Sequence, residues 1–134
     1  MVLVDTSVWI EYLRNTGSRH HLFLRKLVEE DAPIVVTEIV CAEILAGAED
    51  PRDFERLRSL LRHWSVIPIG GLDQYEDAAL LKMACRARGK TVRNIQDCLV
   101  ATVCLREGFS LLHNDRDFDA IAEVTDLKIY PVGS

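Results

Sequence analysis

Residues 1–14, MVLVDTSVWIEYLR, change from a short apolar run to a helical pattern at one junction. The first four residues are continuously apolar, as in a buried strand. Asp5, Thr6 and Ser7 then offer capping groups for a helix that fills the rest of the stretch. A strand that passes directly into a helix is typical of α/β proteins, so this stretch predicts the class of fold.

The same alternation continues along the chain. Apolar runs predict further strands at residues 34–36, 66–69, 110–113 and 127–132, the last an edge strand because it carries Pro131. Helical patterns lie between them, at residues 18–30, 37–47, 51–61, 72–88, 94–108 and 115–122. Because the strands are short and apolar on both faces, we predict a parallel sheet of four or five strands with helices on both sides, a three-layer α/β/α fold.

Length and composition favour one globular domain over residues 1–134. Half of the chain is hydrophobic (49%), and 134 residues suffice to bury a core. No apolar run approaches the ~20 residues of a membrane span, and the first run lacks the preceding positive charge of a signal peptide. The four cysteines form no CxxC pair and the four histidines lack metal-ligand spacing, which argues against a zinc site. We therefore expect a cytoplasmic protein with reduced, buried cysteines.

The net charge of −5 argues against a simple basic-patch nucleic-acid binder but not against a metal-dependent enzyme. Setting aside five candidate metal ligands leaves 16 of the 21 acidic residues against 16 Lys and Arg. The acidity therefore does not decide between these classes of protein.

The first candidate ligand is Glu43, in the stretch IVCAEILAGA at residues 39–48. On a helix, Ile39, Glu43 and Ala46 share one stripe, so the carboxylate interrupts an apolar face. A buried carboxylate without a partner costs several kcal/mol. We therefore expect either that the Glu43 side chain extends to an edge of the protein or that a positive charge lies close to it.

The other four candidates are aspartates at strand ends or on an apolar face. Asp5 follows the first strand, and Asp115 and Asp117 follow the fourth. Asp97 begins the buried face of the helix that leads into the fourth strand. In an open parallel sheet, chemistry collects beyond the carboxyl ends of the strands, where strand order reverses.

Each aspartate also has a structural interpretation. Asp5 fits a helix N-cap, Asp97 fits a capping box with Asn94, and Asp115 and Asp117 fit a first helical turn. These interpretations are independent of one another, whereas one divalent cation accounts for all five acids. Carboxylates without His or Cys suit Mg²⁺ or Mn²⁺.

Four stretches in order resemble the PIN-domain ribonucleases, specifically the VapC-type toxins of VapBC toxin–antitoxin pairs. They are VDTSVWIEYL, EIVCAEILAGA, GKTVRNIQDCLVATVC and NDRDFDAI, and together they span most of the chain. The resemblance implies a sheet of order 3-2-1-4-5, with strands one and four side by side. It also implies a metal-binding set, in which Asp117 is a frequent fifth member: Asp5, Glu43, Asp97, Asp115 and Asp117.

Other residues match or depart from the same pattern. Thr6 and Ser7 match polar residues beside the first aspartate, and Asn94 is expected to support the site from the helix start. His113 departs from the Ser or Thr that often precedes Asn-Asp in the family. The expected role of the polar residues is hydrogen bonding, because a metal-activated water needs no protein nucleophile.

The activity that the resemblance implies is Mg²⁺-dependent endoribonuclease cleavage, with Mn²⁺ as a substitute, leaving a 5′-phosphate and a 3′-hydroxyl. Basic residues near the expected site are candidates for phosphate contact: Lys90, Arg93 and Arg116. The implied partners are an RNA (a tRNA or another structured RNA), a VapB-type antitoxin and a second copy of the chain. Candidate surfaces for these protein partners are exposed apolar residues near Trp9, Phe23 or Trp64, and core packing is the favoured alternative for each one.

Three alternatives to a toxin stay open at this level: a PIN nuclease of RNA processing, a metal-dependent phosphatase and a binding module without catalysis. A phosphatase of the haloacid-dehalogenase type needs a second aspartate two residues after Asp5, where this chain has Ser7. A binding module without catalysis would not need the five acids.

Overall fold

The computed structural model describes residues 1–133. A five-stranded parallel sheet of order β3-β2-β1-β4-β5 forms its centre. The strands are β1 (Val2–Val4), β2 (Ile34–Thr37), β3 (Ser65–Ile67), β4 (Ser110–Leu112) and β5 (Lys128–Ile129). The helices are α1 (Thr6–Leu13), α2 (Arg19–Glu29), α3 (Glu38–Ala46), α4 (Pro51–Leu61), α5 (Leu72–Ala87), α6 (Ile95–Glu107) and α7 (Arg116–Val124).

The predicted class, layers and strand order are confirmed, and the differences lie at the ends of elements. β3 ends before Pro68 and β5 before Pro131, because proline has no N–H to donate to a neighbouring strand. Residue 134, which the predicted domain includes, lies outside the described residues.

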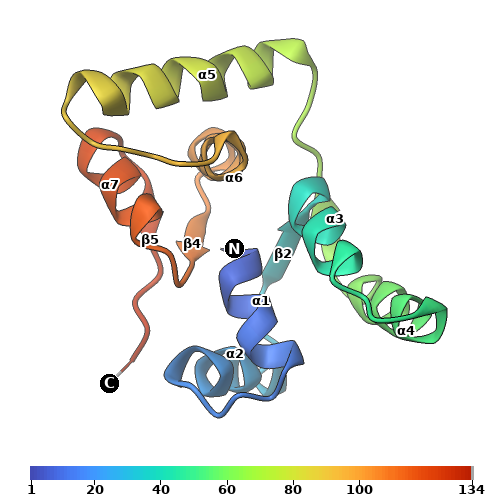
Figure 1. The fold of residues 1–134 in the computed structure, drawn as a ribbon. Helices are drawn as coiled ribbons and strands as arrows, with labels where there is room; N and C mark the ends of the chain where they lie inside the picture. The colour runs from blue at the N-terminus through green and yellow to red at the C-terminus, as the bar shows by residue number, and fades with distance from the viewer. Residues whose placement is uncertain (134) are drawn as a thin grey trace.

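The helices form two layers, one on each side of the sheet (Figure 1). α1–α4 pack against one another on one side, and α5–α7 pack together on the other. This division follows from right-handed crossovers, because the chain moves outward from β1 to β3 and then returns to β4 and β5 on the far side of β1. The reversal of direction makes the β1–β4 pair the topological switch point.

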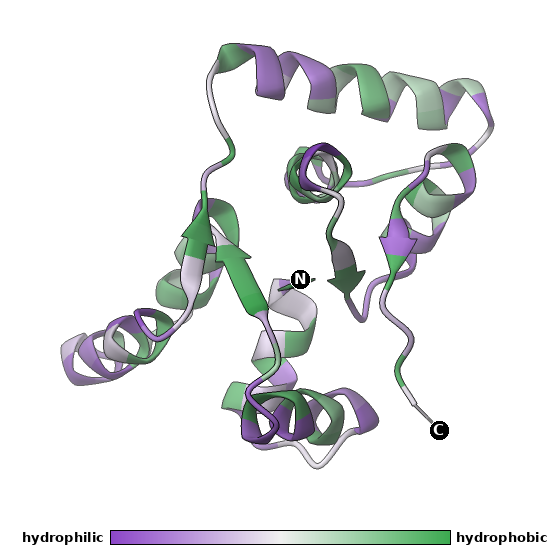
Figure 2. Ribbon diagram, turned by 180° about the vertical axis from the view of Figure 1, so that it is seen from behind, coloured by the Kyte–Doolittle hydropathy of each residue, from purple (hydrophilic) through white to green (hydrophobic). Residues whose placement is uncertain are grey.

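The core lies between these layers. The residues of β1 and β2 are buried without exception, as a parallel sheet requires. α6 lies between the sheet and α5, so seven successive residues, 98–104, are buried on all sides of the helix. By contrast, α2 and α4 carry both hydrophilic and hydrophobic residues, coloured purple and green in Figure 2. Gly108 ends α6 at φ 72°, a left-handed conformation that favours glycine.

This packing places the three aromatic residues near which partner surfaces were expected. Trp9 is fully buried and packs against Trp64 with ring centroids 4.8 Å apart, so core packing, the favoured alternative, holds for Trp9. Trp64 and Phe23 are half-buried.

The four cysteines are free thiols, three buried and one half-buried. Within residues 1–133, no helix has the length and apolar character that crossing a membrane demands.

Candidate metal centre

The carboxyl ends of β1 and β4 form the floor of the candidate site. The Asp5 N–H donates to the Leu112 carbonyl over 2.9 Å, which continues the β1–β4 ladder to the edge of the sheet. Ser7 then joins the two loops that follow these strands. Its hydroxyl donates to Asp5 Oδ2 (2.6 Å) and accepts from the Asn114 N–H (2.9 Å). The loops that carry the acids are thereby fixed relative to one another.

Three aspartates converge above this floor. Asp97, Asp115 and Asp117 each bring a carboxylate oxygen within 4.8 Å of the others. Asp97 lies in the first turn of α6, while Asp115 caps α7 and Asp117 lies in its first turn. Two helix N-termini therefore meet at the trio, and their dipoles favour negative charge there.

Asp97 is the most strongly perturbed member. Its pKa is raised to about 7, first by burial and then by the charges of Asp5, Asp115, Asp117 and Glu43. Its Oδ2 atom is buried without a hydrogen-bond partner. A buried, unpaired carboxylate oxygen among like charges is costly unless a cation is present. The donor set, all carboxylate, fits a hard divalent cation such as Mg²⁺ or Mn²⁺.

Asp5 and Glu43 flank the trio but do not belong to it. Asp5 is buried, and burial raises its pKa against the opposing effect of two hydrogen bonds from Ser7. Glu43 is exposed, so the expectation of a buried carboxylate in an apolar stripe is wrong. The Thr6 hydroxyl donates to Glu43 Oε1 over 3.1 Å and holds the side chain at the opening of the site. The pKa of Glu43 is raised, first by partial burial and also by the charge of Asp5.

Comparison with known proteins identifies this arrangement. The family model described as the PIN domain matches residues 2–124. The chain belongs to the PIN-domain family. Relatives of the VapC group align over 129 residues at 39% identity, covering 96% of each chain: ribonuclease VapC11 of Mycobacterium tuberculosis and VapC ribonuclease Mb1587 of Mycobacterium bovis.

Solved structures share the fold at lower identity. VapBC2 from Rickettsia felis, bound to a DNA fragment from its promoter, superposes with a TM-score of 0.75 at 17% identity, covering 97% of this chain and 98% of that one. VapC20 of Mycobacterium tuberculosis, described as a toxin that cleaves the sarcin–ricin loop, superposes with a TM-score of 0.70 at 21% identity, covering 96% and 99%. These two similarities concern the fold of the PIN domain.

The basic residues near the PIN-domain acids already have partners. Arg93 Nε lies 3.0 Å from Asp117 Oδ2, and its terminal nitrogen lies 3.3 Å from Asp115 Oδ1. The Lys90 ammonium lies 2.5 Å from Glu123. Phosphate contact by Lys90 and Arg93 therefore stays a prediction that requires exchange of these partners. Arg116 is exposed.

The predicted supporting residues divide into two groups. Thr6 and Ser7 donate to acids of the site, as expected for hydrogen-bonding residues. Asn94 makes no side-chain capping bond, and only its carbonyl accepts from the Asp97 N–H. This geometry removes the capping-box interpretation of Asp97.

His113 contributes in a way that the sequence did not suggest. Its ring is buried at the end of β4, and Nδ1 accepts the Asp115 N–H over 3.0 Å. The sequence feature that could have indicated this role is the departure of His113 from the family pattern at this position. His113 thus orients one of the three clustered aspartates from behind.

Proposed function

We propose that this chain is a Mg²⁺-dependent endoribonuclease, with Mn²⁺ as a working substitute, and the toxin of a VapBC-type pair. The observation that carries the proposal is the trio Asp97, Asp115 and Asp117, with the Oδ2 atom of Asp97 buried and unpaired. Asp5 and Glu43 would complete the site or serve a second ion. The ribonuclease activity in the names of the VapC relatives supports the same reaction.

The residues present define the roles in hydrolysis. A cation held by the trio supplies Lewis-acid chemistry, polarising a phosphate oxygen and lowering the pKa of an attacking water. Asp5 and Glu43 lie where they can orient that water or accept its proton. Thr6 and Ser7 are unsuited to act as nucleophiles, because their hydroxyls already donate to Glu43 and Asp5. The products expected from the resemblance to the family are a 5′-phosphate and a 3′-hydroxyl.

The test of this activity uses the purified chain with structured RNAs, including a tRNA pool, in Mg²⁺ or Mn²⁺. Cleavage that EDTA abolishes, with 5′-phosphate products, supports the proposal. Asp97→Asn should lose at least a hundredfold in rate, whereas the exposed Asp126→Asn should cleave as the wild type does. Cleavage at full rate in EDTA or by Asp97→Asn would refute it.

The proposed regulation is capture by a VapB-type antitoxin. A cleft of about 240 Å³ between α1, α3 and α4 includes Glu43 in its lining, together with apolar side chains such as Ile10 and Leu13 and charged ones such as Arg14, Asp53 and Arg56. An antitoxin segment with an apolar anchor and an arginine would match this cleft and the acids beside it. The description of the Rickettsia structure as a VapBC complex supports such a partner.

We further propose that residues 1–134 act as one domain, as a homodimer, in the cytoplasm. Expression of the chain alone should arrest growth, and coexpression with the neighbouring antitoxin frame should restore it and yield a larger complex in size-exclusion chromatography. RNA cleavage without growth arrest or partner binding would favour a PIN nuclease of RNA processing instead.

A further inference from the structure

A second cleft opens beside the metal centre, on the side away from Glu43. Its volume is about 390 Å³, within the range of ligand pockets, roughly 300–1,000 Å³. It lies between the N-terminus of α2, the loop after β4 and the segment after β5. The lining includes Arg19, His20, His113, Asp115, Arg116 and Tyr130. Asp115 belongs to the trio, so whatever fills this cleft lies next to the candidate metal.

Two cations of this cleft are available to a ligand. Arg19 and Arg116 are exposed, and within residues 1–133 neither forms an ion pair. They differ in this respect from Lys90 and Arg93, which face Glu123 and the aspartates. Free guanidinium groups on a wall of a site for phosphodiester chemistry are suited to bind phosphate oxygens.

His113 provides an independent indication of a ligand. It is 9% exposed, and its Nδ1 accepts the Asp115 N–H, so Nε2 carries the proton of the neutral ring. Nε2 lies 3.2 Å from Asp119 Oδ1, which also lines the cleft, but without the alignment of a hydrogen bond. A buried donor without an aligned acceptor, on the wall of a cleft, is satisfied when a ligand supplies an oxygen.

Flat side chains complete the cleft. His20 and Tyr130 are half-buried and line it together. Tyr130 is supported from behind by Phe23, with ring centroids 5.9 Å apart. Unstacked RNA bases bind to such rings, while backbone phosphates bind to arginine.

We propose that this cleft binds a single unpaired nucleotide of the RNA, adjacent to the phosphate that is cleaved. Arg19 and Arg116 bind its phosphate group, and its base stacks on Tyr130. The inference rests on the proposed ribonuclease function, because Asp115 joins the cleft to the trio. It also accounts for the choice of cleavage site, since only an RNA with an unpaired nucleotide at this position fits.

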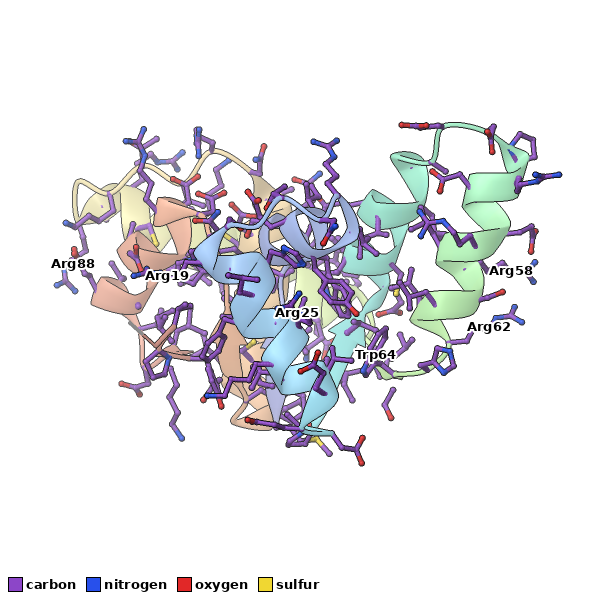
Figure 3. The ribbon with its side chains drawn as sticks, turned by 90° about the horizontal axis from the view of Figure 1, so that it is seen from below. Arg19, Arg25, Arg58, Arg62, Trp64 and Arg88 are labelled. Atoms are coloured by element: carbon purple, nitrogen blue, oxygen red, sulfur yellow. The ribbon has the colours of Figure 1, made fainter. Side chains whose placement is uncertain are left out.

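The test measures the binding of a fluorescein-labelled, 12-nucleotide single-stranded RNA of mixed sequence to the full chain in Mg²⁺. Asp97→Asn is present in every protein to prevent cleavage. Arg19→Gln and Arg116→Gln should each weaken binding roughly three- to tenfold and reduce the salt slope by about 0.7. Arg25→Gln is the matched control: Figure 3 shows it farther along α2 than Arg19, and it does not line the cleft. It should bind RNA within about twofold of the parent protein.

A second pair of variants tests the base. Tyr130→Ala should weaken binding roughly tenfold, and Tyr130→Phe should restore it because the ring remains. Thermal unfolding of Tyr130→Ala separates lost stacking from lost folding. A duplex of the same sequence should bind more weakly than the single strand.

The outcomes separate this inference from the proposed function. If the wild type cleaves RNA but Arg19→Gln, Arg116→Gln and Arg25→Gln bind it equally, the cleft is not an RNA subsite and the inference fails alone. If the wild type cleaves no RNA in Mg²⁺ or Mn²⁺, the proposed function fails with it. With Asp97 intact, the Mn²⁺ affinity of Arg19→Gln should match that of the wild type, because Arg19 lies outside the trio.

Discussion

Replacing Asp97 with asparagine should stabilise the metal-free protein at alkaline pH. The aspartate loses its proton near 3.8 when unfolded, whereas its pKa in the folded chain is about 7. Between these pH values the folded state binds more protons than the unfolded state. This carboxyl therefore lowers the free energy of unfolding progressively as the pH rises from 4 to 7, and by a constant amount above pH 7. The full difference corresponds to roughly 4 kcal/mol, and solvent screening of the partly accessible site reduces it to about 2 kcal/mol.

Urea unfolding in EDTA measures this effect. Near pH 8, the free energy of unfolding of Asp97→Asn should exceed that of the wild type by about 2 kcal/mol. For a chain of this size this corresponds to roughly 5–8 °C in Tm. Near pH 4 the difference should nearly vanish, because the folded aspartate is then neutral and the unfolded one is only about half ionised. Asp126→Asn, exposed and outside the site, should follow the wild type at both pH values. Equal or lower stability of Asp97→Asn near pH 8 would refute the claim that burial and like charges destabilise the ionised Asp97 carboxylate.

Three further substitutions test the surroundings of the trio. Thr6→Val removes the hydrogen bond that lowers the pKa of Glu43, so the acidic limb of the cleavage rate should move to higher pH; an unchanged profile would exclude Glu43 from the reaction. Arg93→Gln frees Asp115 and Asp117 from the guanidinium, so Mn²⁺ should bind severalfold more tightly by calorimetry, and weaker binding would instead show that Arg93 preorganises the acids. Ser7→Ala removes the link between Asp5 and Asn114 and should cost about 1–2 kcal/mol in urea unfolding, with no loss expected if the loops hold each other by other contacts.

The elements could be predicted from local pattern because each strand is a short apolar run that a capped helix follows. The order 3-2-1-4-5 was not contained in those patterns: it followed only from the resemblance, since strand pairing depends on contacts remote in sequence. The position of four aspartates at strand ends and helix starts was predictable for the same local reason. Asp5 and Asp115 lie at the carboxyl ends of neighbouring parallel strands.

Other features required the tertiary structure. The stripe through Glu43 suggested burial, but α3 borders the opening of the site, where the neighbouring layer ends and the side chain is exposed. The partners of Arg93 come from residues 22 and 24 positions later, a pairing that no local pattern specifies. The sequence left both core packing and a partner surface open for Trp9, and the turn of α1 directs it into the core against Trp64.

The most direct test of the metal centre is calorimetric titration of the purified chain with Mn²⁺. We expect the wild type and Asp126→Asn to bind with equal affinity, and Asp97→Asn to bind at least tenfold more weakly while circular dichroism shows an unchanged fold. Binding to Asp97→Asn with wild-type affinity would contradict the assignment of the trio Asp97, Asp115 and Asp117 as the metal site.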